Sequence, residues 1–433
     1  MLSTIRKISQ NGLIKVSGTN GIVTVLKTLI SIVANKVVAV YIGTSGVAMV
    51  GQLQSALNIL TMVSSGGFHQ GVTKYVAEYK NDKKTTSIFI STAFVSTCIL
   101  SLFCGLVTLI FSRNLSSQIF LTDQYFSIIA LLGASLILYN INILFISIIN
   151  GFQQYRKYFK INLFTSILSA IFSIILVVLF KEYGALLSII LSQSLVVIFT
   201  YLMVKNEHWI NSLCIHLFKK EKLRLLLKYT AIIIVGGTIW PVVKIILRTC
   251  IIENISIDEA GIWEATTKLN DYIAFFATGS FSIYLLPRLS EIKDAGLLKK
   301  EIYETYKIII PFSLCLFSII YLLREPIILI LYSSSFIKIE EYLLLQMIGS
   351  FFWICKIIPM NFLLAKGMAK QYLSLELIFC LMYYVLAKIL LPEYGVQGIQ
   401  LSFTIYNFVY FLVNWIIIEQ NMKNKKETTK SNK

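Results

Sequence analysis

The chain has 433 residues, of which 56% are apolar and only 14% are charged. Soluble domains carry about 25% charged residues, so this composition excludes a soluble globular protein and indicates an integral membrane protein. The net charge of +17 would also suit a nucleic-acid-binding protein, so the positions of the charges have to decide between the two classes.

Apolar runs long enough to cross a bilayer recur along the chain. A helical span needs about 20 apolar residues, and the runs are continuous rather than alternating, which excludes a transmembrane barrel. The N-terminal MLSTIRKISQNG lacks an apolar core followed by a small-residue cleavage site, so we expect no removable signal peptide. We expect twelve spans, at residues 16–42, 46–66, 85–111, 122–150, 161–180, 185–204, 229–249, 261–286, 308–323, 342–365, 371–390 and 396–418.

Basic residues gather in alternate loops. The N-terminal segment, every second loop and the C-terminal tail together hold 28 lysines and arginines, whereas the remaining loops hold 4. This asymmetry is the positive-inside pattern of membrane proteins. It predicts that both termini are cytoplasmic, and it explains most of the basic excess without a nucleic-acid partner.

The longest polar connection divides the chain into two sets of six spans. We expect an N-terminal lobe at residues 1–204, a cytoplasmic loop at 205–228, a C-terminal lobe at 229–418 and a basic tail at 419–433. Two six-helix bundles related by an axis along the membrane normal are a transporter architecture, with the substrate path between the halves.

A weak internal repeat supports this division. Three residues near the end of the second span of the first lobe recur in the second lobe at a constant offset of 213 residues: Gly66, Phe68 and Glu78 match Gly279, Phe281 and Glu291. We therefore expect an elbow after the second helix of each lobe.

Leaving out Asp123 at the very start of the fourth span, ten charged residues lie within the expected spans. A charged side chain at membrane depth costs about 2.5–3.5 kcal/mol on insertion scales, so such residues face the bundle interior or a cavity and are functional candidates. They are Lys27, Lys36, Lys244, Arg248, Glu264, Lys268, Asp271, Lys356, Glu376 and Lys388. Lys36 is close enough to a helix end to snorkel, and Glu376 and Lys388 are expected to be interfacial.

Helical spacing sorts the deeper residues. Lys27 lies on a polar stripe at three- and four-residue spacing, and Lys244 and Arg248 share one face just after Pro241. The stripe around Lys27 consists of Asn20, Thr24, Lys27, Ser31 and Asn35.

Glu264, Lys268 and Asp271 form another stripe, in which the lysine can pair with both acids. This triad is a candidate either for proton coupling or for a self-neutralised packing network. After this pairing, four cations remain without an acid and predict an anionic, phosphate-bearing substrate: Lys27, Lys244, Arg248 and Lys356. For each of them singly, snorkelling or a satisfied core contact is the alternative.

Motifs for chemistry are absent from the sequence. There is no G-x-x-x-x-G-K-[ST] phosphate loop and no H-E-x-x-H pair, and the seven cysteines show no C-x-x-C spacing. We expect no catalytic residue, no metal and no cofactor. The sequence favours a transporter over an enzyme.

Three stretches resemble one family of transporters. They are GGFHQGVTKYVAEY at residues 66–79, DEAGIW at 258–263 and SFSIYLLPRLSEI at 280–292. With these stretches the chain resembles the Wzx-type oligosaccharide flippases of the multidrug/oligosaccharidyl-lipid/polysaccharide exporter superfamily. The likeness covers almost the whole chain in span number and layout, and is nearest to the branch that moves O-antigen and enterobacterial common antigen units.

The resemblance implies an all-α membrane protein with two six-helix lobes around a central cavity, as in multidrug exporters of the superfamily. It also implies translocation of an undecaprenyl-pyrophosphate-linked oligosaccharide to the periplasmic leaflet of the bacterial inner membrane, by alternating access without ATP hydrolysis. Membrane lipids, a polysaccharide polymerase and a chain-length regulator are the expected partners. Lys27, Lys244, Arg248 and Lys356 would contact the pyrophosphate or an acidic sugar.

Three other functions remain open from the residues. A drug/cation antiporter of the same superfamily would need acids in the first lobe, whose spans carry none at membrane depth. A flippase for a lipid-linked peptidoglycan precursor is chemically closer. A scaffold for polysaccharide assembly enzymes would not depend on the membrane cations at all.

Overall fold

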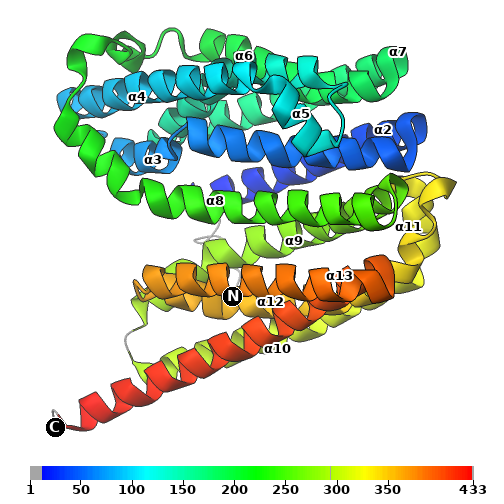
Figure 1. The fold of residues 1–433 in the computed structure, drawn as a ribbon. Helices are drawn as coiled ribbons and strands as arrows, with labels where there is room; N and C mark the ends of the chain where they lie inside the picture. Colours follow the sequence, from blue (N-terminus) through cyan, green and yellow to red (C-terminus); the bar gives the residue numbers. More distant parts are fainter. Residues whose placement is uncertain (1–11, 293, 432–433) are drawn as a thin grey trace. The chain divides into compact units, whose positions relative to one another are not determined.

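The computed structural model describes residues 12–292 and 294–431, which are nearly all helical (Figure 1). The chain divides into two compact units, Met1–Ile245 and Ile246–Lys433. This division falls inside one helix, and the lobe boundaries expected at residues 204 and 229 stay a prediction.

The first unit consists of long helices and shorter ones, among them the amphipathic helix α3, which packs against α4 and α6. In chain order it contains α2 (Gly12–Ser64), α3 (Phe68–Glu78), α4 (Lys83–Ile110), α5 (Ser112–Phe120), α6 (Phe126–Gly151), α7 (Tyr155–Val204), the short turns η1 (His208–Ser212) and η2 (Ile215–Leu217), and most of α8 (Lys220–Asn254).

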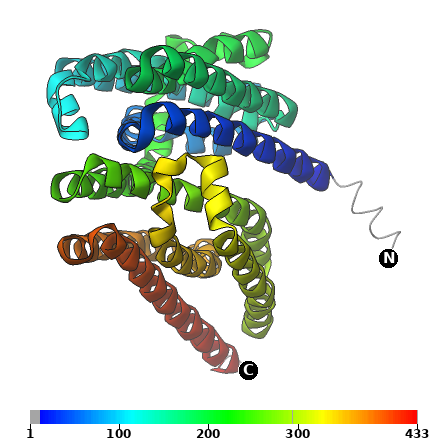
Figure 2. The same cartoon turned by 90° about the vertical axis from the view of Figure 1, so that its right-hand side faces the viewer.

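The second unit begins with the last turns of α8. It continues through α9 (Ile257–Glu291), α10 (Ala295–Leu322), α11 (Arg324–Leu331), η3 (Ser334–Phe336), α12 (Ile339–Ala365) and α13 (Ala369–Ser431). Figure 2 shows the short α11 between the ends of α10 and α12. Within this unit α12 packs mainly against α13 and α9.

Three of the long helices are pairs of spans joined at a break. The backbone has positive φ at Gly43 in α2 (66°), at Lys181 in α7 (48°) and at Gly395 in α13 (58°). Each break lies between two expected spans, so these helices account for six of them. With α4, α6, α8, α9, α10 and α12 the fold contains the twelve expected spans, and the predicted fold class is confirmed.

A glycine follows each break three residues later, and in two cases it permits close contact between the two arms. A Cβ added at Gly184 would lie 1.8 Å from the carbonyl oxygen of Leu176, and one added at Gly398 would lie 2.4 Å from that of Leu390. Only glycine allows the backbones to approach this closely. The two hairpins are therefore built alike in the two units, a repeat that the sequence comparison missed.

The expected elbow after the second helix exists in the first unit. Gly66 and Gly67 both have positive φ (61° and 64°), which ends α2 and starts α3 in a new direction. The apolar face of α3, with Phe68 and Val72, enters a core that also contains Trp209.

In the second unit the elbow prediction is wrong, because α9 runs as one helix to Glu291. The sequence gives a reason. The first unit has two consecutive glycines, which adopt the left-handed conformation at little cost, whereas Gly279 is followed by Ser280. The side chains of residues 273–284, including Phe281, lie outside the described ones.

Candidate substrate and coupling site

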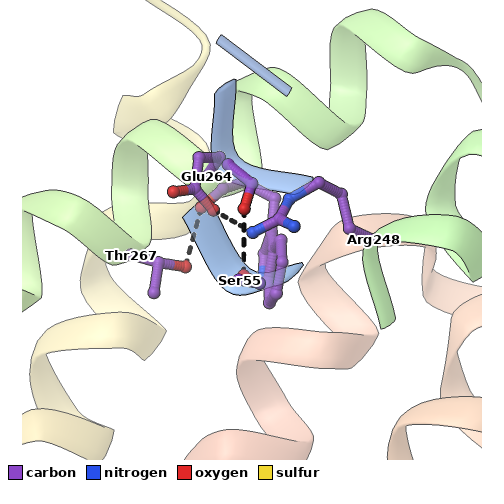
Figure 3. A network of polar contacts seen from close by, with 6 residues as sticks. Ser55, Arg248, Glu264 and Thr267 are labelled. Atoms are coloured by element: carbon purple, nitrogen blue, oxygen red, sulfur yellow. Dashed lines mark hydrogen bonds and ion pairs between the residues drawn. The ribbon is translucent and has the colours of Figure 1, made fainter. Parts of the chain in front are cut away.

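A buried ion pair joins α8 to α9 at the start of the second unit. Ser256 caps α9 by accepting a hydrogen bond from the Glu259 amide (3.2 Å), so α9 starts directly after the turn. Arg248 is fully buried and its guanidinium forms an ion pair with the carboxylate of Glu264, which is 5% exposed (Figure 3). The guanidinium also lies 5.6 Å from the centroid of the Trp263 ring, a cation–π contact.

This pairing differs from the one expected from the sequence. Glu264 was expected to share Lys268 with Asp271, which would leave Arg248 without an acid. The structure instead gives Arg248 a carboxylate on the neighbouring helix. The expectation that Arg248 is an uncompensated charge is therefore wrong.

Lys268 and Asp271 lie further along the same helix. Lys268 is half-buried and Asp271 is exposed, while Asn270 between them is buried and accepts a hydrogen bond from the Ser350 hydroxyl of α12. Both ionisable residues have interactions with their surroundings. A coupling role for Glu264, Lys268 and Asp271 stays a prediction.

Lys356 is enclosed by aromatic residues in the core of the second unit. Its side chain comes from α12, is 1% exposed, and donates a hydrogen bond to the hydroxyl of Tyr406 on α13. The ammonium nitrogen lies 4.4 Å from the ring centroid of Tyr406 and 4.5 Å from that of Tyr410. Two electron-rich rings and a hydroxyl oxygen together favour the positive charge on the lysine.

Glu376 lies near this lysine, and sequence reasoning misplaced it. Its position in the first turns of α13 suggested an interfacial residue, but it is only 8% exposed. Its carboxylate interacts electrostatically with Lys356. The signal that could have found it is the buried face formed by Glu376, Cys380 and Tyr383 at helical spacing. Lys356 therefore has an acid nearby, as Arg248 does, although both cations were expected from the sequence to lack one.

Lys27 lies in the first unit, as do Lys36 and Lys244. It is partly exposed on α2, and its amine donates a hydrogen bond to the amide oxygen of Asn162 on α7 (3.2 Å). Further along the predicted polar stripe, the Asn35 amide donates to the Ser31 hydroxyl (3.4 Å). The side chains of Asn20 and Thr24 lie outside the described ones. This hydrogen bond of Lys27 is thus to a neutral group, in contrast to the ion pair of Arg248.

The remaining membrane cations are distributed over three helices. Lys244 is half-buried in α8, which continues as a helix through Pro241. Lys36 on α2 is half-buried and Lys388 on α13 is exposed. Lys244 and Lys36 both interact with their surroundings. Within each unit, the described contacts do not bring all of the predicted cations into one cluster.

An apolar cavity of about 580 Å³ lies between α10 and α13 in the second unit. Tyr303, Tyr306, Pro311, Phe411 and Trp415 are among the residues that line it. Aromatic rings pack edge to face along this wall, with Tyr306 and Trp415 5.6 Å apart between centroids. The lining suits an apolar chain or ring better than a charged headgroup.

Clusters that could hold a metal were not found among the described residues, where no three His, Cys, Asp or Glu side chains converge. Eight helices in the described part of the chain are long and apolar enough to cross a membrane, and α9 adds a further long helix. The protein is a multi-pass membrane protein.

Comparison with known proteins decides the family. Residues 14–293 match the family described as polysaccharide biosynthesis protein. The chain belongs to this family. Two curated relatives, both named lipid III flippase, come from Escherichia coli K12 and Shigella flexneri. Each is 24% identical over 398 residues, which cover 90% of this chain and 94% of the relative. The resemblance to oligosaccharide flippases of the exporter superfamily is confirmed.

Solved structures share the fold. An inward-facing multidrug transporter of the MATE family and MOP superfamily superposes with a TM-score of 0.79 at 15% identity, covering 93% of this chain and 96% of that one. An outward-facing transporter of the same family gives 0.67 at 14% identity, over 95% and 96%. A MOP superfamily transporter from Pyrococcus furiosus, titled for the reverse polarity of its binding pocket, gives 0.65 at 14% identity over 95% and 96%. The fold is MATE-like, as the sequence predicted.

Proposed function

We propose that this protein is a flippase that moves an undecaprenyl-pyrophosphate-linked oligosaccharide, such as an O-antigen repeat unit, from the cytoplasmic to the periplasmic leaflet of the bacterial inner membrane. The observation that carries the proposal is the match, over 90% of the chain, to relatives named lipid III flippase. The mechanism is alternating access of two helical lobes, and both termini lie in the cytoplasm as the positive-inside pattern indicates.

The predicted cations supply the headgroup contacts in this proposal. Lys27 and Lys244 rank first because their side chains are partly exposed, and a lysine binds phosphate as a point charge. Arg248 and Lys356 are buried next to Glu264 and Glu376. Arg248 and Lys356 could contact a pyrophosphate only if they gave up their interactions with these glutamates.

Partners follow from the same function. Membrane lipids surround the apolar helices, and a polysaccharide polymerase and a chain-length regulator would receive the flipped unit on the periplasmic side. These assembly partners are proposals from the reaction sequence that a flipped repeat unit must enter.

Complementation tests the function. A strain that lacks its own O-unit flippase is supplied with this gene, and surface polysaccharide and drug resistance are both scored. The proposal predicts restored polysaccharide and unchanged drug resistance. Restored drug resistance without polysaccharide would instead favour a drug/cation antiporter, and neither effect with normal membrane expression would contradict flipping of this substrate class.

Site variants distinguish transport from scaffolding. Lys27→Glu places an acid where the headgroup contact is proposed, and Lys36→Glu, nine residues further on the same helix, is the matched control. Export that falls in the first variant and persists in the second supports the assignment. Equal export in both at normal expression would fit a scaffold, whose action does not depend on this charge.

A further inference from the structure

The apolar cavity between α10 and α13 lies near one end of both helices. Its lining comes from residues between 303 and 311 on α10 and between 411 and 415 on α13. These segments lie at the start of the ninth expected span and near the end of the twelfth. The positive-inside pattern predicts that this end of both helices faces the cytoplasm. The cavity is therefore expected in the cytoplasmic leaflet, at the depth where lipid chains meet their headgroups.

Aromatic residues form a fixed wall of the cavity. The hydroxyl of Tyr306 donates a hydrogen bond to the carbonyl of Cys355 on α12 (2.9 Å), and its ring packs edge to face against Trp415. The ring of Tyr303 lies 5.9 Å from that of Trp415. α10 packs mainly against α12 and less against α13, which leaves the space between α10 and α13 open. Tyrosine and tryptophan are also the residues that gather at membrane interfaces.

The cavity opens at the surface of the second unit. Tyr303 and Leu412, which line it, are both exposed. Leu314 lies four residues beyond Ile310, and Phe408 lies four residues before Leu412, so each continues a lining face one turn deeper into the expected membrane. Leu314 and Phe408 are exposed as well. A hydrocarbon chain can therefore enter the cavity from the side and continue along these two apolar faces.

The rim of the cavity carries a positive charge. Of the described residues that line it, Lys307 alone is charged. Its ammonium pairs with the carboxylate of Glu304 (2.9 Å), and such an exposed pair contributes little to stability. Lys300, four residues before Glu304, also interacts with that carboxylate. Lys307 can therefore turn to another anion while Glu304 keeps a cation.

Pro311 adds an acceptor to the same rim. Proline has no N–H, so the carbonyl of Lys307, four residues earlier in α10, lacks its usual helical donor. A lysine ammonium and a carbonyl acceptor beside an apolar cavity match a ligand with a hydrocarbon chain, an anionic phosphate and a hydroxyl-bearing headgroup. Basic pockets between membrane helices on the cytoplasmic side bind acidic lipid headgroups in this way.

We propose that the cavity between α10 and α13 binds an anionic glycerophospholipid of the cytoplasmic leaflet, with one acyl chain in the cavity and the phosphate at Lys307. The chain and the phosphate of one membrane lipid are then both bound at the same place. The proposed substrate would instead place its pyrophosphate at Lys27 or Lys244, which belong to the first unit. The bound lipid fills the space between the two helices and stabilises the second unit.

Quenching of Trp415 by brominated lipids tests the site. The purified full chain is placed in phosphatidylcholine vesicles that contain the same fraction of either phosphatidylglycerol or phosphatidylcholine with brominated chains. The difference between the wild type and Trp415→Phe isolates the signal of Trp415. Brominated phosphatidylglycerol is expected to bind roughly fivefold more strongly, because one lysine near the membrane surface contributes about that factor to the binding of an anionic lipid. Equal binding of the two lipids would overturn the proposal.

Lys307→Gln tests the headgroup contact. This variant is expected to lose the preference for phosphatidylglycerol. Lys370→Gln is the matched control, because it removes an exposed lysine at the start of α13 that does not line the cavity. A preference that is equally strong in both variants would contradict the assignment of the phosphate to Lys307.

Ile310→Phe tests the acyl chain. The larger side chain occupies part of the cavity, whereas Ile308→Phe changes an exposed residue of α10 that does not line it. In detergent, added phosphatidylglycerol is expected to raise the unfolding temperature of the wild type and of Ile308→Phe more than that of Ile310→Phe. The same increase in all three proteins would contradict the proposal. If Ile310→Phe does not fold, the surface variant Lys307→Gln provides the same comparison.

Competition separates a membrane phospholipid from the proposed substrate. Undecaprenyl diphosphate without bromine is added to vesicles that contain brominated phosphatidylglycerol, and the recovery of Trp415 fluorescence is compared with that caused by the same fraction of unbrominated phosphatidylglycerol. The proposal predicts no greater recovery with undecaprenyl diphosphate. A much greater recovery would show that the cavity takes the polyprenyl tail and would overturn the assignment to a phospholipid.

Discussion

The two units treat charges in the membrane differently. In the second unit Arg248 has the carboxylate of Glu264, and Lys356 has Glu376 nearby. In the first unit Lys27 donates to the neutral amide of Asn162, and Asp123, at the start of the fourth expected span, is the one acidic residue of the sequence within the unit's expected spans. Two cations of the second unit thus have an acid nearby, whereas the described contact of Lys27 in the first unit is with a neutral amide. Lys27, in the first unit, is therefore the leading candidate for the proposed headgroup contact.

The largest effect is expected from breaking the Arg248–Glu264 pair. Arg248→Ala leaves a buried carboxylate without its cation, which typically destabilises a protein by about 3–5 kcal/mol. The double variant Arg248→Met with Glu264→Met replaces both charges by apolar groups and is expected to recover most of this loss. Thermal unfolding in detergent measures both. Equal stability of Arg248→Ala and the wild type would show that Arg248 does not compensate the buried charge of Glu264.

A smaller effect is expected at the two matching hairpins. Alanine at Gly184 or at Gly398 would bring a Cβ against a backbone carbonyl of the other arm. Overpacking of this kind costs roughly 1–3 kcal/mol. The clash is tighter at Gly184, so Gly184→Ala is expected to lower the unfolding temperature more than Gly398→Ala. A reversed order would show that the hairpins of the two units are not built alike.

Lys27 is expected to matter little for stability. Its side chain is partly exposed and its hydrogen bond to Asn162 is to a neutral amide, so Lys27→Gln is expected to change the unfolding free energy by less than about 1 kcal/mol. Binding of a polyprenyl diphosphate to the purified protein is expected to weaken roughly tenfold or more, because a hydrogen bond to a charged group contributes about 1.5–3 kcal/mol. Lys36→Gln is the control, and a large loss of stability in Lys27→Gln would indicate a packing role.

The smallest effect concerns Glu207, between α7 and η1 outside the spans. Partial burial opposes ionisation, but hydrogen bonds from Lys157 and Gln154 (3.0 Å to the latter) outweigh it and hold the pKa of Glu207 below its ordinary 4.5. A lowered pKa stabilises the folded state above pH 4.5, and this contribution is lost as the pH falls below that value. Unfolding temperatures at pH values on either side are expected to show a slope that Glu207→Gln reduces. An identical slope in Glu207→Gln would contradict a stabilising contribution from ionised Glu207.

Hydropathy and charge patterns were sufficient to predict the membrane-spanning helices, but not the side-chain contacts between different helices. The twelve spans follow from apolar runs of bilayer length. The partner of Glu264 could not be predicted, because Arg248 lies on another helix and helical spacing reports only neighbours on the same one. Glu376 looked interfacial from its position near a helix end, but packing of α12 against α13 buries it. The elbow after Gly279 was predicted from three repeated residues that did not include the second glycine of Gly66–Gly67.

Flipping of a fluorescent undecaprenyl-diphosphate oligosaccharide in proteoliposomes tests the central claim most directly. A quencher that cannot cross the bilayer reports the leaflet that the lipid occupies. The account predicts rapid exchange between leaflets with the wild type and with Lys36→Gln, and a rate lower by roughly tenfold or more with Lys27→Gln. Exchange no faster than in protein-free liposomes, or the same rate in all three proteins, would contradict it.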